Sequence, residues 1–177
     1  MYRFKNILVT GAAGFIGSNF VRMLSKRFID ITVISYDKLT YAGNLENLGD
    51  LTHDKNHHFI QGDIADKNKV ASILREYHID TIVHFAAESH VDNSINDPEI
   101  FFNTNVMGTL ALLEQARRYW LDKRELNENQ CRFHHISTDE VYGTLAKDAP
   151  QFTESTAYAP NSPYSASKAG SDHVVRC

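Results

Sequence analysis

The sequence predicts an α/β fold built on a doubly wound parallel sheet. Short apolar runs of strand length alternate along the 177 residues with longer segments whose apolar residues recur at helical spacing. A glycine-rich turn joins the first strand-like run to the first helical segment. With 42% hydrophobic and 23% charged residues, the composition is typical of a globular protein with a substantial core. We therefore expect one domain over residues 1–177.

The first strand, turn and helix have the clearest pattern. Phe4–Thr10 is a short apolar run that suits a buried strand. The helical pattern that opens at the following glycines continues to about Arg27, with apolar residues at helical spacing at Phe15, Ile16, Phe20, Val21 and Leu24. The glycines follow the pattern Gly11-x-x-Gly14-x-x-Gly17. Small residues let the backbone approach a pyrophosphate closely, and the N–H groups at a helix start favour an anion. The sequence therefore predicts a phosphate-binding turn.

The second strand, Ile31–Tyr36, ends at Asp37, which lies 20 residues after Gly17. Strand, glycine turn, helix, strand and acidic residue form the Rossmann-type unit that binds dinucleotides, with the acid at the ribose. A carboxylate accepts hydrogen bonds from ribose hydroxyls and repels a 2′-phosphate, which favours NAD over NADP. The neighbouring Lys38 weakens that preference. The alternative is that the glycines serve helix–strand packing only.

The middle of the chain continues the alternation of strands and helices. Residues 38–57 are polar and predict a loop with one short helix around Leu45–Leu48. His58–Gln61 predicts the third strand, and Lys67–Tyr77 the helix after it. Asp63 lies before that helix, where it would serve as the helix cap.

The fourth strand, Asp80–Phe85, is followed by the small residues Ala86 and Ala87. Small residues at the carboxyl end of a strand leave room for a flat cofactor. Asp97-Pro98 predicts the start of a long helix that runs to about Trp120. Leu121–Gln130 is a polar connection, and Arg132–Ile136 is the fifth strand.

Two hydroxyls and two carboxylates follow the fifth strand in the stretch Ser137-Thr138-Asp139-Glu140. In a parallel sheet this stretch reaches the same edge as the glycine turn, where an acid and a base would be useful. Alone, such a stretch is more typical of a helix N-cap or a solvated turn.

The final helical segment places a tyrosine and a lysine on one face. After a proline-containing loop over residues 144–163, Tyr164 and Lys168 stand at positions i and i+4 of a helix. An ammonium group near a phenol lowers the pKa of the phenol, so Tyr164 becomes a usable base near neutral pH.

Charge and composition exclude several classes of function. The net charge of -4, without a basic block, predicts no binding to nucleic acid or to an anionic membrane. The sequence has no secretory signal and no apolar run near the ~20 residues of a membrane span, so we expect a cytoplasmic protein. Cys131 and Cys177 predict neither a disulfide framework nor a metal site. Within each of the pairs His57-His58 and His134-His135, the two side chains would point to opposite faces of a strand, which also argues against a metal site.

Together these motifs resemble the short-chain dehydrogenase/reductase superfamily. There, the Gly-x-x-Gly-x-x-Gly turn and a set of hydroxyl, tyrosine and lysine, here Thr138, Tyr164 and Lys168, are usual. The stretch Ser137–Gly143 narrows the resemblance to the extended, nucleotide-sugar branch and, within it, to the dTDP-glucose 4,6-dehydratase family. Three more segments support this resemblance, which covers nearly the whole chain: Asp37–Asn44, Ala86–Asp92 and Pro163–Lys168.

The resemblance implies NAD as cofactor, bound by the glycine turn and by residues that follow the strands. The implied cofactor contacts are Gly11, Gly14, Phe15, Ile16, Gly17, Asp37, Lys38, Leu39, Thr40, Asp63, Ile64, Ala86, Ala87, Ser89, Thr104, Tyr164 and Lys168. The implied catalytic residues are Thr138, Asp139, Glu140, Tyr164 and Lys168, and the implied substrate contacts are Ser89, His90 and Thr138. Asp63 would bind the adenine edge as well as cap its helix.

The resemblance further implies a hydro-lyase that converts dTDP-glucose to dTDP-4-keto-6-deoxyglucose, a precursor of rhamnose and other deoxysugars. Oxidation at C4 is followed by loss of water across C5–C6 and return of the hydride to C6. Tyr164 takes the 4-hydroxyl proton, Glu140 takes the C5 proton, and a protonated Asp139 gives its proton to the leaving 6-hydroxyl. The two carboxyl groups must then hold opposite protonation states, which requires different environments.

Other functions remain open from the sequence. A nucleotide-sugar 4-epimerase or decarboxylase would share the cofactor site and the tyrosine–lysine pair but has no need for Asp139 and Glu140. A UDP-glucose 4,6-dehydratase would act on the same sugar joined to another nucleotide. A non-catalytic NAD-binding module is the alternative of another class, and the presence of Thr138, Tyr164 and Lys168 argues against it.

Members of the resembled family are considerably longer than 177 residues. We therefore expect an NAD-binding domain with its catalytic residues, truncated before the substrate-binding C-terminal part. The nucleotide-sugar-binding domain would be absent, and the chain alone would be inactive and would expose apolar surface. The full-length protein is expected to be a homodimer.

Overall fold

The computed structural model describes residues 4–123, 126–127 and 129–177. The chain separates into two compact units. The first comprises the described residues of Met1–Ala86 and Ala111–Ile136, and the second comprises Ala87–Leu110 and Ser137–Cys177. No linker-like composition marks the boundaries of these units in the sequence.

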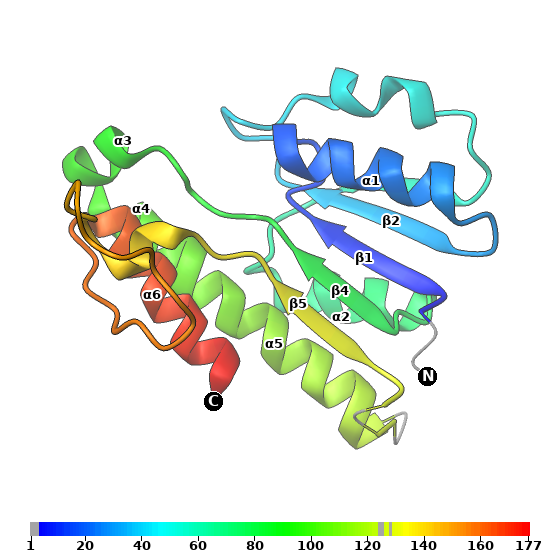
Figure 1. Cartoon of the computed structure of the whole chain (residues 1–177). Helices are drawn as coiled ribbons and strands as arrows, with labels where there is room; N and C mark the ends of the chain where they lie inside the picture. The colour runs from blue at the N-terminus through cyan, green and yellow to red at the C-terminus, as the bar shows by residue number, and fades with distance from the viewer. Residues whose placement is uncertain (1–3, 124–125, 128) are drawn as a thin grey trace. The chain divides into compact units, whose positions relative to one another are not determined.

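A parallel sheet forms the centre of the first unit (Figure 1). Among the described residues its five strands lie in the order β3-β2-β1-β4-β5. Their bounds are Asn6–Thr10 for β1, Thr32–Asp37 for β2, His57–Gln61 for β3, Thr81–His84 for β4 and Arg132–His135 for β5. At the carboxyl edge, Thr10 pairs with Tyr36 on one side and with His84 on the other. The strand order and direction confirm the predicted parallel sheet.

Helices cover both faces of this sheet. On one face Val9 and Val33 form a buried cluster with Val21 of α1 (Phe15–Arg27) and with the 3₁₀ helix η1 (Leu45–Leu51). On the other face Leu8 and Ile34 pack with α2 (Lys67–Glu76) and with α5 (Thr109–Arg117). Successive strand residues point to opposite faces, so each apolar strand supplies both clusters. The doubly wound arrangement is confirmed.

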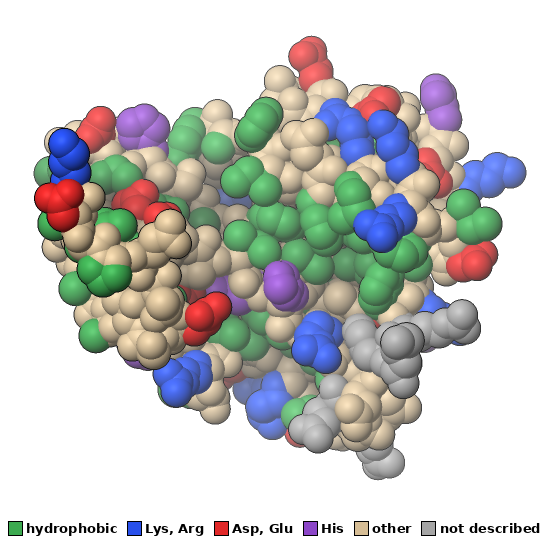
Figure 2. All heavy atoms as spheres, viewed as in Figure 1, with side chains coloured by type: hydrophobic (Ala, Val, Ile, Leu, Met, Phe, Trp, Pro, Cys, Tyr) green, Lys and Arg blue, Asp and Glu red, His purple; other side chains and the backbone are tan. Residues whose placement is uncertain are grey.

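The face of the sheet that carries α1 is incompletely covered by the described elements. Figure 2 shows hydrophobic side chains gathered beside α1, over β1 and β4. Phe4 and Phe28 form an edge-on pair with ring centroids 5.2 Å apart, and Phe20 and Phe85 form a second pair at 5.2 Å. All four rings are only partly buried. Apolar surface therefore stays exposed along this face.

The second unit is mainly helical. It contains α3 (Val91–Asn96), α4 (Pro98–Phe101), the π-helical segment η2 (Phe102–Gly108), the 3₁₀ helix η4 (Asp139–Tyr142) and α6 (Pro163–Arg176). α6 packs against the other four elements. Gly170 allows a close approach to η2, because a Cβ there would lie 3.1 Å from Val106 Cγ2. No helix among the described residues is long and apolar enough to cross a membrane.

The prediction of one regular helix from Asp97 to Trp120 is wrong in detail. The helical run passes through α4, the π segment η2, α5 and a second π segment, η3 (Arg118–Lys123). Asp97 makes no capping hydrogen bond with its side chain, and it closes the preceding helix α3, which was not predicted. A π turn shifts the helix by about one residue, and the apolar pattern of a short segment does not separate it from an α turn.

Candidate active site

The glycine turn lies between β1 and α1 in the first unit. Gly11 has a φ of +66°, which favours glycine, and its N–H donates to Tyr36 O at 2.9 Å. A Cβ on Gly11 would lie 2.6 Å from Ala86 N, and a Cβ on Gly17 would collide with Gly11 O. Both glycines are therefore required for the packing of the turn. Phe15, the first residue of α1, is 82% exposed.

Asp37 fixes the turn to the end of β2. Its carboxylate accepts hydrogen bonds from Ala13 N at 2.9 Å and from Leu39 N at 2.8 Å, and its side chain is buried. Each carboxylate oxygen has a further lone pair for a ligand hydroxyl. The structure thus brings the predicted ribose-binding acid into contact with the predicted phosphate-binding turn.

Replacement of Asp37 by asparagine is expected to destabilise the first unit by about 1–3 kcal/mol, because an amide N–H₂ then faces a buried backbone N–H. Urea denaturation measures the effect. The control is Asp30→Asn, since Asp30 is exposed in the turn before β2. Equal stability of the two variants would contradict the assigned role.

Asp63, after β3, forms an ion pair with Lys38, with Nζ 2.8 Å from Oδ2. Partial burial raises the pKa of the Asp63 carboxyl, but the hydrogen bonds from Lys38 and Ala65 N, with the Lys38 charge, place the pKa below its usual value. The prediction that Asp63 caps the next helix is wrong. Asp66 caps α2 by accepting from Asn68 N and Lys69 N, since it lies directly before the first helical residue. Two other predicted cofactor contacts lie nearby in the sequence. Thr40, three residues after the end of β2, is exposed, and Ile64, next to Asp63, is buried.

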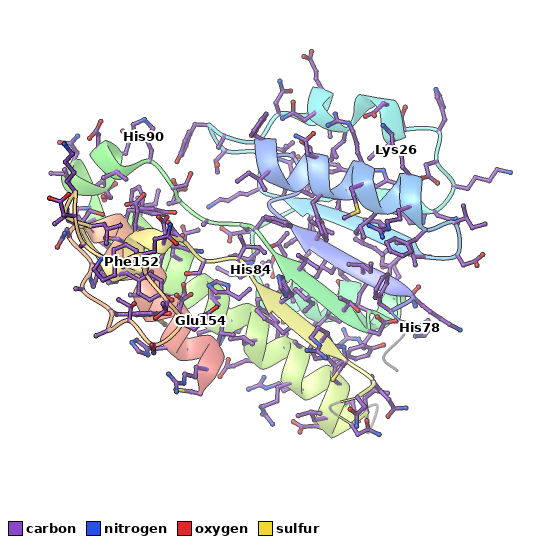
Figure 3. All side chains as sticks on the ribbon, in the orientation of Figure 1. Lys26, His78, His84, His90, Phe152 and Glu154 are labelled. Carbon is purple, nitrogen blue, oxygen red and sulfur yellow. The ribbon has the colours of Figure 1, made fainter. Side chains whose placement is uncertain are left out.

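A buried histidine at the end of β4 belongs to no motif that the sequence reveals. His84 lies within β4 (Figure 3), and its Nδ1 shares a hydrogen bond of 2.6 Å with Thr10 Oγ1. Ala86 N donates to the same hydroxyl at 3.2 Å. Thr10 and His84 therefore hold Ala86 beside Gly11. Their pairing follows from the register of the two strands, which the predicted topology alone did not provide.

In the second unit, Tyr164 and Lys168 lie in the first half of α6. Both are buried, with 9% and 4% of their surfaces exposed. Burial lowers the pKa of the Lys168 ammonium to about 8, and the carboxylate of Asp172 acts in the opposite direction. Ser162 and Ser165 form a reciprocal capping box that fixes the start of the helix. The ring of Phe101 stands edge-on to Tyr164 at 6.4 Å.

Thr138 caps η4, and its hydroxyl accepts from Glu140 N at 3.3 Å. The helix-cap interpretation of this stretch is therefore correct for Thr138. Asp139 and Glu140 are both exposed in the first turn of η4, which packs against α6. Burial does not distinguish the two carboxyl groups, so the different environments that the reaction requires must come from elsewhere.

A buried asparagine joins two predicted segments of the second unit. Asn105, in η2, accepts from Glu88 N at 2.8 Å and donates to Glu88 O and to Ser167 Oγ, both at 2.9 Å. It thereby ties the segment that holds Ala87 and Ser89 to α6. Thr104 precedes it in η2 and is partly buried. His90 is exposed at the start of α3 and makes no capping hydrogen bond there.

A model of the GDP-mannose 4,6 dehydratase family matches residues 8–177. The chain belongs to this family. It is 54% identical to a dTDP-glucose 4,6-dehydratase of Salmonella typhimurium over 96% of this chain and 49% of that protein. The chain thus spans about half the length of the curated relatives it matches.

Two solved structures show how far the family likeness extends. A dTDP-glucose 4,6-dehydratase from Streptomyces venezuelae, with NAD bound, is 49% identical with a TM-score of 0.85, over 97% of this chain and 50% of that one. A UDP-glucose 4-epimerase from Thermotoga maritima is 31% identical with a TM-score of 0.80, over 97% and 50%. The Rossmann-type fold is therefore shown, and dehydratases and epimerases share it.

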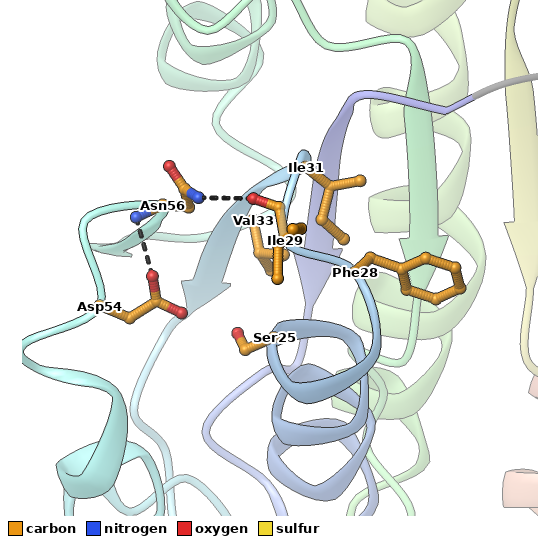
Figure 4. Close-up of a pocket in the computed structure, with 7 residues that line it drawn as sticks. All are labelled: Ser25, Phe28, Ile29, Ile31, Val33, Asp54 and Asn56. Atoms are coloured by element: carbon orange, nitrogen blue, oxygen red, sulfur yellow. Dashed lines mark hydrogen bonds between the residues drawn. The ribbon is translucent and has the colours of Figure 1, made fainter.

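A small cavity in the first unit of this family member contains none of the predicted site residues. It lies near the end of α1 and the start of β2, at the amino edge of the sheet (Figure 4), and its lining is Ser25, Phe28, Ile29, Ile31, Val33, Asp54 and Asn56. Its volume of ≈ 120 Å³ is well below the ~300–1,000 Å³ of most ligand pockets. Asn56 Nδ2 donates to Ile29 O at 3.1 Å, so this lining side chain is engaged in a structural contact.

Proposed function

We propose that this chain takes part in the NAD-dependent dehydration of dTDP-glucose to dTDP-4-keto-6-deoxyglucose. The observation that carries the proposal lies in the second unit. There η4, with Asp139 and Glu140, packs directly against α6, with Tyr164 and Lys168. A redox reaction at C4 requires the tyrosine and lysine, and an elimination requires two further proton-transfer groups. The names of the relatives in the dehydratase family agree with that reaction.

The residues of the first unit suit NAD. Gly11 and Gly17 let the turn pack closely against Ala86 and against its own backbone, and the helix start that follows, where Phe15 is exposed, would favour a phosphate. Asp37 has free lone pairs for the ribose hydroxyls and would repel a 2′-phosphate. Lys38 is paired with Asp63, so its charge is partly offset. When bound, NAD would supply the acceptor for the hydride of C4 and hold it until it returns to C6 of the sugar.

The proposed roles of the chain's own groups follow from their chemistry. Tyr164 takes the proton of the 4-hydroxyl, and the Lys168 ammonium favours its phenolate. Thr138 donates a hydrogen bond to the sugar. Glu140 removes the C5 proton, and Asp139 gives a proton to the 6-hydroxyl as it leaves as water. We propose that the bound sugar gives the two carboxyl groups the different environments that their exposed positions lack.

The remaining site residues are proposed to contact the cofactor or the substrate. Phe15, Ile16, Leu39, Thr40, Asp63, Ile64, Ala86, Ala87, Ser89 and Thr104 are proposed to contact NAD, and Ser89 and His90 the sugar nucleotide. The expected homodimer, the cytoplasmic location and a separate nucleotide-sugar-binding domain are likewise predictions.

Product analysis tests the proposal. The NAD-loaded protein is incubated in parallel with dTDP-glucose and UDP-glucose. The products are separated, and their masses are measured by mass spectrometry. We expect dTDP-glucose to lose one molecule of water and UDP-glucose to react more slowly. An isomer of unchanged mass would favour the 4-epimerase, and a faster reaction of UDP-glucose would favour the UDP-glucose dehydratase.

A further inference from the structure

Asp172 lies on the same helix as the predicted catalytic pair. It follows Lys168 by four residues in α6, so the two side chains share one face of the helix. The Asp172 side chain is half-buried, and its Oδ1 atom is enclosed by protein. Sequence motifs point to Tyr164 and Lys168 on this helix but not to Asp172.

The carboxylate of Asp172 anchors the segment that carries Asp139 and Glu140. Ser137 Oγ donates to Asp172 Oδ2 at 2.6 Å. Ser137 directly precedes Thr138, whose hydroxyl in turn accepts from Glu140 N. A short hydrogen bond to an ionised carboxylate is about twice as strong as one between neutral groups. The start of η4 is therefore tied to α6 at this oxygen.

A second hydroxyl reaches the same oxygen. Tyr158 OH donates to Asp172 Oδ2 at 2.9 Å from the loop before α6. The ring of Tyr158 also contacts Tyr142, at the end of η4, and His173, at centroid distances of 5.4 and 5.3 Å. One carboxylate oxygen thus joins the residue before the cap of η4, the loop that follows η4, and α6.

Asp172 also acts on the charge of Lys168. Burial lowers the pKa of Lys168, and the Asp172 carboxylate is the charge that opposes this effect. The charges of two other groups near Asp172 affect the pKa of Tyr158: Tyr142 raises it and Arg176 lowers it. On the side of η2, the buried Glu88 is linked through Asn105 to Ser167, next to Lys168. Loss of the Asp172 charge would lower the pKa of Lys168 further.

We propose that Asp172 is a positioning residue for both parts of the reaction, because it anchors the Thr138–Glu140 segment through Ser137 and supplies the countercharge of Lys168. The reaction itself rests on the proposed function, whereas the contacts do not. A purely structural residue would change the stability of the second unit without changing the ionisation of Lys168.

Three variants separate the two roles. Asp172→Asn keeps an acceptor oxygen but loses the charge, Ser137→Ala keeps the charge but loses the anchor, and Asp148→Asn is a control at an exposed loop carboxylate. ¹³C NMR of the labelled Lys168 side chain gives its pKa directly. We expect Asp172→Asn to lower that pKa below the wild-type value of about 8, while Ser137→Ala and Asp148→Asn leave it unchanged.

Kinetics give the second readout. A lysine that must stay charged loses activity as the pH rises through its pKa, so Asp172→Asn should move the high-pH loss of kcat to lower pH. Ser137→Ala should lower kcat several-fold at every pH with KM and the pH profile unchanged. Asp172→Glu should restore the Lys168 pKa toward that of the wild type. An unchanged Lys168 pKa in folded Asp172→Asn, or wild-type kcat in Ser137→Ala, overturns the inference.

The outcome for Asp172 is distinguishable from the outcome for the proposed function. If the wild-type protein forms no 4-keto-6-deoxy product, the proposed function fails, and the NMR titration still decides whether Asp172 sets the charge of Lys168. If Asp172→Asn does not fold, the pKa in Asp172→Glu and the kcat of Ser137→Ala decide. The inference is also overturned if the Lys168 pKa shifts from the wild-type value in Asp172→Glu but not in the control Asp148→Asn.

Discussion

Replacement of Glu140 by glutamine is expected to reduce formation of the 4-keto-6-deoxy product by about 10²- to 10⁴-fold. The amide cannot take the C5 proton, whereas Tyr164 and Lys168, on α6, are unaltered. The oxidation at C4 should therefore persist in a single turnover while the elimination stops. Mass spectrometry of the product and exchange of the C5 hydrogen with deuterated water measure the two effects. Asp139→Asn should also block loss of water but retain C5 exchange.

The matched control is Glu154→Gln. Glu154 is an exposed carboxylate in the loop before α6 (Figure 3), within the same unit as Glu140. It should leave product formation unchanged. Normal product formation by both Glu140→Gln and Asp139→Asn would contradict their assignment as base and acid.

Replacement of Gly17 by alanine is expected to weaken NAD binding by about 10- to 100-fold. The added Cβ would collide with Gly11 O, and the backbone must shift to relieve it. Such overpacking costs about 1–3 kcal/mol, which is about 5- to 150-fold in affinity and includes that range when the displaced turn is the phosphate site. Isothermal titration calorimetry with NAD gives the affinity.

Gly49→Ala is the matched control in the same unit. Gly49 lies in η1, and a Cβ added there would have no neighbour within 4 Å. Its NAD affinity should equal that of the wild type. If Gly17→Ala binds NAD as tightly as Gly49→Ala does, the turn is not the phosphate site.

The first half of the fold was predictable because local chemistry and periodicity agree there. The helix predicted from the glycine turn to about Arg27 is α1, which begins at Phe15 and ends at Arg27, because the turn fixes its start and Val21 and Leu24 are buried. The strands were placed within about two residues for the same reason.

The helices of the second unit were harder to predict. Val91–Asn96 is mostly polar and lacks an apolar period, yet it forms α3, because it packs against α6 and buries Ser94. The π segments of the long helical run were also missed. Asn105, in the π segment η2, makes hydrogen bonds to Glu88 and Ser167 that no local pattern contains.

The candidate site divides in a similar way. Thr138, Tyr164 and Lys168 could be named from short motifs, because their spacing itself reflects the chemistry. Asn105 and Asp172 could not be named so. Their partners lie far along the chain, with Asn105 separated from Ser167 by 62 residues and Ser137 from Asp172 by 35. Such pairs become visible only once the packing around α6 is known.

The path of the hydrogen at C4 tests the proposed function most directly. dTDP-glucose labelled with deuterium at C4 is converted in ordinary water, and the product is analysed by NMR. A dehydratase of the proposed mechanism places the deuterium at C6 and a solvent hydrogen at C5. Deuterium retained at C4 of an epimerised sugar, or released into the solvent, would contradict the proposed function.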